Sequence, residues 1–164
     1  MTSSQSMKFR PVMIEDTDHI YRLICALAAH EKRPDAVTAT PAMIERLLFG
    51  PAATAHGLVA VLDGHIVGYA LMAIKFSSFR GQRLLYLEDI FIDPDVRGQG
   101  YGKAFMQAVA AFAQDNNCVS MEWSALDFNQ EALRFYGKIG ATREGGRIYF
   151  EGDEAFMQDL LESE

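Results

Sequence analysis

The chain has 164 residues, 49% of them hydrophobic, which is enough for one domain with a substantial core. Its 22 acidic and 15 basic residues give a formal net charge of −7, which argues against nucleic-acid binding because affinity for phosphate backbones depends on excess Lys and Arg. The sequence shows no apolar run of membrane-spanning length and no secretory signal pattern, so we expect a cytoplasmic protein that does not bind membranes. We expect a disordered tail over residues 1–6 and a single domain over residues 7–164.

The cysteines and histidines do not indicate a metal site. Cys25 and Cys118 are far apart in apolar segments, so both are predicted to be buried free thiols. The four histidines lack the spacing of metal ligands, such as two histidines four residues apart on one helix. No metal cofactor is therefore expected.

The first third of the chain predicts one strand and two helices. Residues 8–12 are a short strand candidate, and residues 15–31 predict a helix with an acidic first turn, as the helix dipole favours. The apolar face of this helix consists of Ile20, Leu23, Ile24, Leu27 and Ala28. Thr40 followed by Pro41 predicts the start of a second, shorter helix that runs to about Phe49.

The middle of the chain predicts strands. Two β-rich runs flank Asp63 and Gly64, a pair that a tight hairpin turn with positive φ prefers. After a polar loop over residues 77–83, residues 84–93 form a largely apolar strand that we expect to lie centrally in the sheet. Glu88 and Asp89 interrupt its apolar character.

The last part of the chain returns to helical periodicity. A helix is predicted from the glycine-rich segment to about Asn116, followed by a strand over residues 119–125 and a helix over residues 129–139. Two short strands are predicted around Gly145 and Gly146, and residues 153–164 predict a terminal helical turn or two. This order of elements predicts a mixed α/β domain without repeats.

The three glycines Gly98, Gly100 and Gly102 suggest an anion-binding loop. Their G-x-G-x-G spacing, late in the chain, differs from the dinucleotide fingerprint G-x-G-x-x-G of a first βα turn. A Walker A loop is excluded because Ala104 stands where that motif requires Ser or Thr. The remaining interpretation is that backbone N–H groups of this loop, at the N-terminus of a helix, bind a pyrophosphate. A glycine-rich turn without function is less favoured, because each glycine costs conformational entropy.

Three segments carry a family resemblance. LLYLEDIFI over residues 84–92, VRGQGYG over residues 96–102 and FYGKIGA over residues 135–141 resemble the GCN5-related N-acetyltransferase (GNAT) superfamily, and most of all its diamine (spermidine/spermine) branch. The resemblance extends over about residues 8–150. It implies an α/β (α+β) fold with a central mixed, mostly antiparallel sheet of about seven strands flanked by about four helices. It also implies acetyl-CoA as cosubstrate and a homodimer.

The resemblance implies which residues bind the coenzyme. The backbone of Ile90, Phe91 and Ile92 would pair with the pantetheine arm, in the manner of an added strand. Asn129 would lie near the thioester, and it equally suits the N-cap of the helix that follows. The residues implied for the pyrophosphate are Arg97, Gly98, Gln99, Gly100, Tyr101, Gly102 and Lys103.

Two residues are candidates for the chemistry of direct acetyl transfer to an amine. Tyr136 corresponds to the family's general acid, and the reference pKa of a phenol, about 10, is close enough to that of a thiol, about 8.5, for proton transfer to the departing thiolate. From spacing alone it is a core tyrosine. Glu88 would accept the ammonium proton or hold the amine, and an ordinary solvent-facing or ion-paired residue is the alternative. Strand alternation would then place Asp89 on the opposite side of the sheet.

Further positions relate to the acceptor amine. His30 and Glu31 align with an aromatic and acidic pair that borders the amine site of the diamine branch, while Trp123 and Glu144 fall near other positions lining that site. Each of these residues also suits ordinary packing or surface roles. Arg80 and Arg83 in the polar loop depart from the branch, and their charges would repel a polyamine.

The sequence thus predicts an N-acetyltransferase that acts on a small primary amine, a diamine, polyamine or amino-acid-like cation. A peptide N-terminal or protein lysine acetyltransferase is an alternative within the class. A noncatalytic acyl-CoA-binding module is an alternative outside it, and the presence of both Glu88 and Tyr136 favours an enzyme.

Overall fold

The computed structural model describes residues 6–163. All but Ser6 of the tail expected over residues 1–6 lies outside this range, as does residue 164. The chain divides into two compact units, a larger one over residues 1–130 and a smaller one over residues 131–164. The single domain expected over residues 7–164 stays a prediction.

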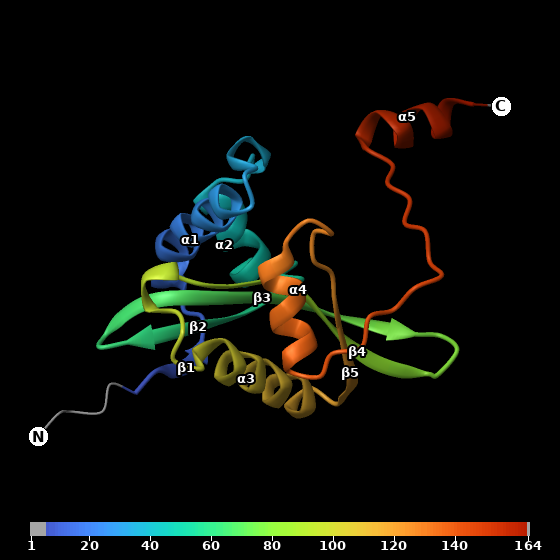
Figure 1. Ribbon diagram of the computed structural model, residues 1–164. Helices are drawn as coiled ribbons and strands as arrows, with labels where there is room; N and C mark the ends of the chain where they lie inside the picture. The colour runs from blue at the N-terminus through green and yellow to red at the C-terminus, as the bar shows by residue number, and fades with distance from the viewer. Residues whose placement is uncertain (1–5, 164) are drawn as a thin grey trace, which may run out of the picture. The chain divides into compact units, whose positions relative to one another are not determined.

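The larger unit is built on one five-stranded sheet (Figure 1). Its strands lie in chain order, with the first three pairs antiparallel and the last pair parallel, which confirms a mixed, mostly antiparallel sheet. β4 has a neighbour on each side, as its apolar sequence predicts. The strands are β1 (Lys8–Pro11), β2 (His56–Leu62), β3 (His65–Ser77), β4 (Gln82–Ile92) and β5 (Cys118–Trp123).

The turn between β2 and β3 is the hairpin that the sequence predicts. Asp63 has φ 51° and Gly64 has φ 82°, so both residues adopt the left-handed conformation that a tight hairpin turn requires. Aspartate and glycine tolerate this conformation better than other residues do. The confirmed turn fixes the register of β2 against β3.

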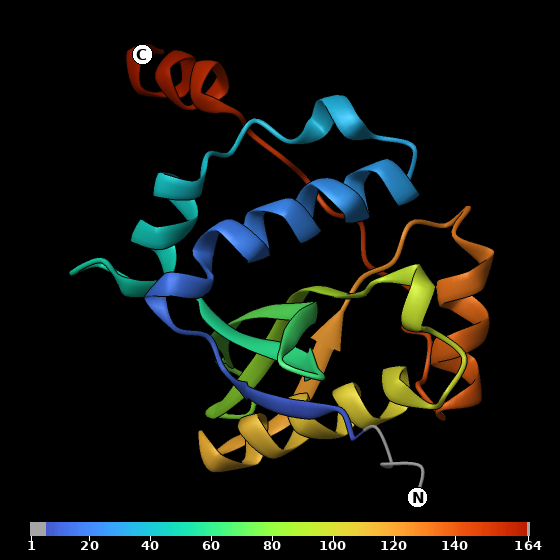
Figure 2. The ribbon, with the colours of Figure 1, turned by 90° about the vertical axis from the view of Figure 1, so that its left-hand side faces the viewer.

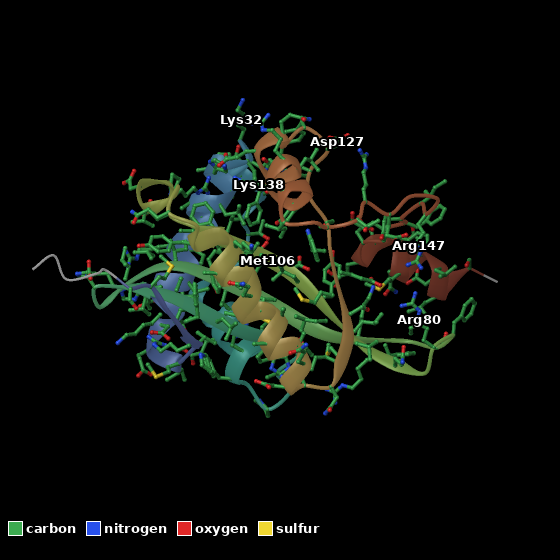
Figure 3. The ribbon with its side chains drawn as sticks, turned by 60° about the horizontal axis from the view of Figure 1, so that its bottom comes forward. Lys32, Arg80, Met106, Asp127, Lys138 and Arg147 are labelled. Atoms are coloured by element: carbon green, nitrogen blue, oxygen red, sulfur yellow. The ribbon has the colours of Figure 1, made fainter. Side chains whose placement is uncertain are left out.

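Helices cover both faces of this sheet, as Figure 2 shows. α1 (Thr17–His30) and α2 (Pro41–Phe49) lie on one face, and α3 (Tyr101–Asp115) lies on the other. The core on the α1 side includes Ile20, Ile44, Val59, Tyr69 and Phe91. On the α3 side Phe105 and Val109 are fully buried, and Met106 points from α3 toward the sheet (Figure 3). Short 3-10 turns occupy Ile14–Asp16, Pro34–Ala36 and Pro94–Val96.

An ion pair fixes the start of α1 to β1. Arg10 donates to both carboxylate oxygens of Asp16, at 2.6 and 3.0 Å, and the Met13 N–H donates to the same carboxylate at 2.8 Å. The hydrogen bonds from Arg10 lower the pKa of the buried Asp16 below its usual range. These charge-assisted hydrogen bonds hold the N-terminal end of α1 against β1.

The smaller unit has fewer elements than the sequence predicts. α4 (Gln130–Lys138) reaches into it from the unit boundary, and α5 (Glu154–Glu162) confirms the terminal helix. The two short strands predicted around Gly145 and Gly146 are wrong, because residues 141–153 form no strand. Ile148, Tyr149 and Phe150 have strand propensity, yet they lie exposed without a neighbouring backbone to complete a ladder. The sheet therefore has five strands, two fewer than the seven or so expected.

Candidate active site

The candidate site lies where β4 and β5 separate. β4 pairs with β3 as far as Ile92, which is opposite Gly68. Its pairing with β5 ends earlier, at Leu87 opposite Trp123. Residues 88–92 of β4 therefore have a strand neighbour on the β3 side only, within the part of the chain that the structure describes. We call this stretch the open edge.

The register determines which backbone groups face the open edge. The N–H of Asp93 donates to the carbonyl of Val67 at 2.8 Å, on the β3 side. Because backbone groups of an antiparallel strand alternate in direction, those of Phe91 face β3, and those of Ile90 and Ile92 face the open edge. Among the three residues predicted to pair with a pantetheine arm, Ile90 and Ile92 thus have the direction that such pairing needs.

A β-bulge occurs in β4 at Glu88. Leu71 of β3 lies opposite Asp89, and the next residue Met72 lies opposite Leu87, so Glu88 is an extra residue without a partner in β3. Such bulges bend a strand and redirect its side chains, and they are common next to active sites. The sequence signal for it is the pair of carboxylates in an otherwise apolar strand. The bulge interrupts the alternation from which the direction of Asp89 was predicted.

Beyond the bulge, Asp89 shares a sheet face with Tyr69 and Phe91. The hydroxyl of the fully buried Tyr69 donates to Oδ2 of Asp89 at 3.2 Å. Burial raises the pKa of both groups, and the negative charge of Asp89 raises the pKa of Tyr69 further. The sequence did not predict this contact, because 20 positions separate the two residues and no local pattern links them.

Three carboxylates gather around this point, and we call Glu31, Glu88 and Asp89 the acidic cluster. Glu31 caps the C-terminal end of α1, Glu88 is exposed at the bulge, and Asp89 is half-buried. Burial is the main cause of the raised Asp89 pKa, and the charges of Glu88 and Glu31 add to it. His30 lies at the same end of α1, with its ring 6.3 Å from that of Phe91. The structure thus brings together His30, Glu31 and Glu88, three predicted site residues.

The glycine loop, residues 97–103, leads from β4 into α3. Gly98 has φ 90° and Gly100 has φ 81°, a conformation that side-chain-bearing residues rarely adopt. Gly100 is the N-cap of α3, and no side chain caps this helix end. The first N–H groups of α3 therefore have no side-chain cap, and anion binding there stays a prediction.

Side chains of the loop also hold the loop in place. Arg97 donates from Nε to the carbonyl of Ile92 at 2.9 Å, and its guanidinium lies 5.3 Å from the centre of the Phe91 ring. The hydroxyl of Tyr101 donates to the Gln99 side chain at 3.2 Å, and Lys103 is exposed. Arg97 thus links the glycine loop to the end of the open edge.

The remaining predicted residues lie at the end of β5, just before α4 and in the smaller unit. Trp123 ends β5 opposite Leu87, where the two strands separate, and Asn129 directly precedes α4. Tyr136 is half-buried on α4, 5.3 Å from the Phe135 ring, and Glu144 is exposed in the segment before α5. Tyr136 and Glu144 belong to the smaller unit, and their roles in a common site stay predictions.

Comparison with known proteins identifies the family. The profile of the acetyltransferase (GNAT) family matches residues 18–141 of the chain. The chain belongs to the GNAT acetyltransferase family. The match covers β4, the glycine loop and α4, the elements that carry the three resembling segments, so the predicted family is confirmed.

Individual relatives agree with this assignment of the GNAT chain. It is 35% identical to the thialysine N-epsilon-acetyltransferase of Bos taurus, over 84% of this chain and 88% of that protein. It is 29% identical to the human spermidine/spermine N(1)-acetyltransferase-like protein 1, over 90% of this chain and 23% of that longer protein. A solved integron cassette protein from V. cholerae has the same fold, with a TM-score of 0.79, 23% identity and coverage of 98% and 100% of the two chains.

Family membership makes this GNAT chain an acetyltransferase, and GNAT acetyltransferases use acetyl-CoA as cosubstrate. Cys25 and Cys118 are free thiols as predicted, Cys118 buried and Cys25 half-buried. Over residues 6–163 no three His, Cys, Asp or Glu side chains form a group that could hold a metal ion. None of the helices in that range is long and apolar enough to cross a membrane.

Two Gly→Ala changes, one in the glycine loop and one in α4, are expected to change the free energy of unfolding in opposite directions. Gly100→Ala forces a Cβ into the left-handed region, so we expect the free energy of unfolding to fall by about 1–2 kcal/mol. Gly137→Ala in α4 meets no atom within 4 Å and needs no positive φ, so we expect a gain of about 0.4–1 kcal/mol. Denaturant unfolding of both variants measures this, and equal effects would contradict the assigned loop conformation.

Proposed function

We propose that this acetyltransferase moves the acetyl group of acetyl-CoA to a primary amine of a small cationic substrate, such as a diamine, a polyamine or an amino acid with a side-chain amine. The observation that carries the proposal is the acidic cluster at the open edge. Three carboxylates close together repel one another, and a cation among them relieves that repulsion. A relative named for thialysine and another named for spermidine and spermine support the same class of substrate.

Arg80 and Arg83, whose charges would repel a cationic substrate, lie away from the acidic cluster. Arg80 is on the loop between β3 and β4, well apart from Lys32 at the end of α1 (Figure 3). Arg83 is five residues from Glu88 along β4, about 17 Å at roughly 3.4 Å per residue. Because the Debye length is about 8 Å at physiological salt, their repulsion of an amine at the acidic cluster is largely screened.

The open edge and the glycine loop fit the parts of acetyl-CoA. The amide groups of a pantetheine arm match the N–H and C=O of Ile90 and the N–H of Ile92, in the way that a strand adds to a sheet edge. The Ile92 carbonyl is engaged by Arg97. The glycine loop offers the uncapped N-terminus of α3 to the pyrophosphate, whose charge the helix dipole favours. Bound there, acetyl-CoA would supply an activated acetyl thioester.

Two side chains would move the protons of the transfer. The amine nitrogen forms a bond to the acetyl carbon as the carbon–sulfur bond breaks, so one proton leaves nitrogen and one reaches sulfur. Glu88, exposed on the bulge beside Asp89, would accept the proton from nitrogen, directly or through water. Tyr136 would give its phenolic proton to the departing sulfur. Asp89 and Glu31 would hold the cationic substrate.

A panel of acceptors tests the proposed function. With acetyl-CoA and the purified chain, we expect CoA release to be fast with diamines, polyamines and lysine-like amino acids and slow with neutral amines and peptides. Glu31→Gln, which removes one charge of the acidic cluster, should raise the KM of the best cationic amine about fivefold.

Glu45→Gln is the matched control for this panel, because Glu45 is an exposed carboxylate on α2. It should leave the KM of every amine unchanged. Turnover of peptides alone would contradict the small-amine substrate and favour a peptide or protein acetyltransferase. Coenzyme binding without turnover of any acceptor would favour a noncatalytic module.

Tyr136→Phe tests the general acid. The change removes only the hydroxyl, so we expect kcat to fall by about 100-fold or more, while the Kd of acetyl-CoA stays the same. Tyr21→Phe is the control, because Tyr21 is a tyrosine of α1 that has no role in the proposed chemistry. Steady-state kinetics and calorimetric titration measure the two quantities, and an unchanged kcat would remove Tyr136 from this role.

We further propose a homodimer that buries the exposed apolar surface of the smaller unit. Soluble monomers seldom expose many large apolar side chains in one segment. A second copy of the chain would cover this surface without any other partner. The side chains concerned are Ile148, Tyr149, Phe150, Phe156, Met157, Leu160 and Leu161, all more than half exposed.

Light scattering coupled to size exclusion tests the dimer. We expect a mass twice the 18.3 kDa of one chain. Leu161→Lys places a charge on the exposed apolar surface and should shift the mass toward one chain. The control Val119→Lys changes an exposed apolar residue of β5 and should leave the dimer intact. A wild-type mass of one chain would refute the dimer.

A further inference from the structure

The hydrogen bond between Tyr69 and Asp89 carries an inference about a residue that lies outside the expected site. Tyr69 comes from β3, the strand next to the open edge, and its hydroxyl reaches Oδ2 of Asp89 from within the core. We propose that Tyr69 is a positioning residue, which acts through Asp89 to set how the enzyme holds the cationic amine. This inference rests on the proposed function, because it assigns Asp89 to amine binding.

Packing fixes the position of the Tyr69 hydroxyl. The residue is completely buried, in one cluster with Ile20, Ile44 and Val59, and its ring centre lies 6.5 Å from that of Phe91. A ring held on all sides cannot turn its hydroxyl elsewhere. Burial and the nearby negative charge raise the pKa of Tyr69 well above its usual range, so its hydroxyl keeps its proton and stays a donor.

The contact determines what Asp89 can offer to a substrate. Oδ2 accepts from Tyr69, which leaves Oδ1 as the oxygen for the ammonium group, since the structure gives the Asp89 side chain no other hydrogen bond within residues 6–163. A carboxylate anchored at one oxygen presents the other in a fixed direction. Asp89 is half-buried, so it lies between the core and the exposed Glu88.

The contact also favours the charged form of Asp89. Burial, Glu88 and Glu31 raise its pKa, and the hydrogen bond from Tyr69 lowers it. The other charged or titratable groups nearby are the Cys25 thiol on α1, which acts on Tyr69, and His30 and Arg97, which both lie beside Phe91. Without the hydroxyl, the Asp89 pKa rises, and the carboxylate loses its charge at a higher pH. As the pH falls, amine binding by the variant therefore begins to weaken at a higher pH than amine binding by the wild type.

Tyr69→Phe tests the inference, because it keeps the packed ring and removes the hydroxyl. With the amine that the wild type acetylates fastest, we expect KM to rise about tenfold while kcat changes little. We expect the low-pH limb of kcat/KM to move up by about one pH unit. The same amine is used with both proteins, so its own titration cancels. The KM of acetyl-CoA should not change.

Tyr86→Phe is the matched control. Tyr86 is a tyrosine of β4 whose hydroxyl lies 3.5 Å from the Ser124 hydroxyl, whereas the Asp89 carboxylate is bonded by Tyr69. It should leave the amine KM and the pH profile at their wild-type values. Thermal unfolding of both variants shows whether either change disturbs the fold.

A double-mutant cycle separates positioning from packing. Asp89→Asn removes the charge that Tyr69 is proposed to hold, so adding Tyr69→Phe to it should raise the amine KM no further. If Tyr69→Phe raises KM equally in both backgrounds, it acts through packing, and the inference is overturned.

The outcomes also separate this inference from the proposed function. A wild type that turns over cationic amines, with a Tyr69→Phe variant that keeps its KM and pH profile, overturns the positioning role alone. A wild type that turns over none of the small amines overturns the proposed function and this inference together. The expected shifts in KM and pH limb, absent in the Tyr86→Phe control, support both.

Discussion

The architecture of the site depends on one constraint, that β4 keeps its partner β3 to the end and loses its partner β5 halfway. Had β5 followed β4 to Ile92, its backbone would fill the hydrogen-bonding positions of the open edge. The parallel pair instead ends at Leu87, and from there the backbone of Ile90 and Ile92 is directed to the space between the strands. In the proposed function, acetyl-CoA and the amine would therefore meet along β4.

The bulge lets β4 carry two neighbouring carboxylates in different environments. One extra residue at Glu88 puts an exposed carboxylate beside a half-buried one, and it brings Asp89 onto the sheet face where the core tyrosine lies. Glu31 arrives from α1, whose start Arg10 and Asp16 fix. Neighbouring carboxylates that differ in burial and in hydrogen bonding can take different tasks, one in proton transfer and one in binding charge.

Much of the fold follows from local patterns in the sequence, and the site follows from them only in part. The Asp63–Gly64 turn, the apolar strand 84–93 and the glycine loop are visible because short-range chemistry determines them. The bulge and the contact of Tyr69 depend on strand register, which no single segment encodes. The strands predicted at Gly145 and Gly146 failed for a related reason, because a strand needs a neighbour as well as propensity. His30 and Glu31 were found through family resemblance alone.

The link from Arg97 to the Ile92 carbonyl has a consequence for the length of the acyl group. It joins the glycine loop to the end of the open edge, so a hydrogen bond ties together the two regions proposed to hold acetyl-CoA. If the pyrophosphate binds at the glycine loop and the pantetheine arm binds along the open edge, as proposed, this link would help to set where along β4 the thioester lies. In that arrangement a longer acyl chain would extend toward the bulge, where the amine is proposed to bind. Selectivity for a short acyl group would thus come from the position at which the coenzyme is anchored rather than from a pocket that encloses the acyl group.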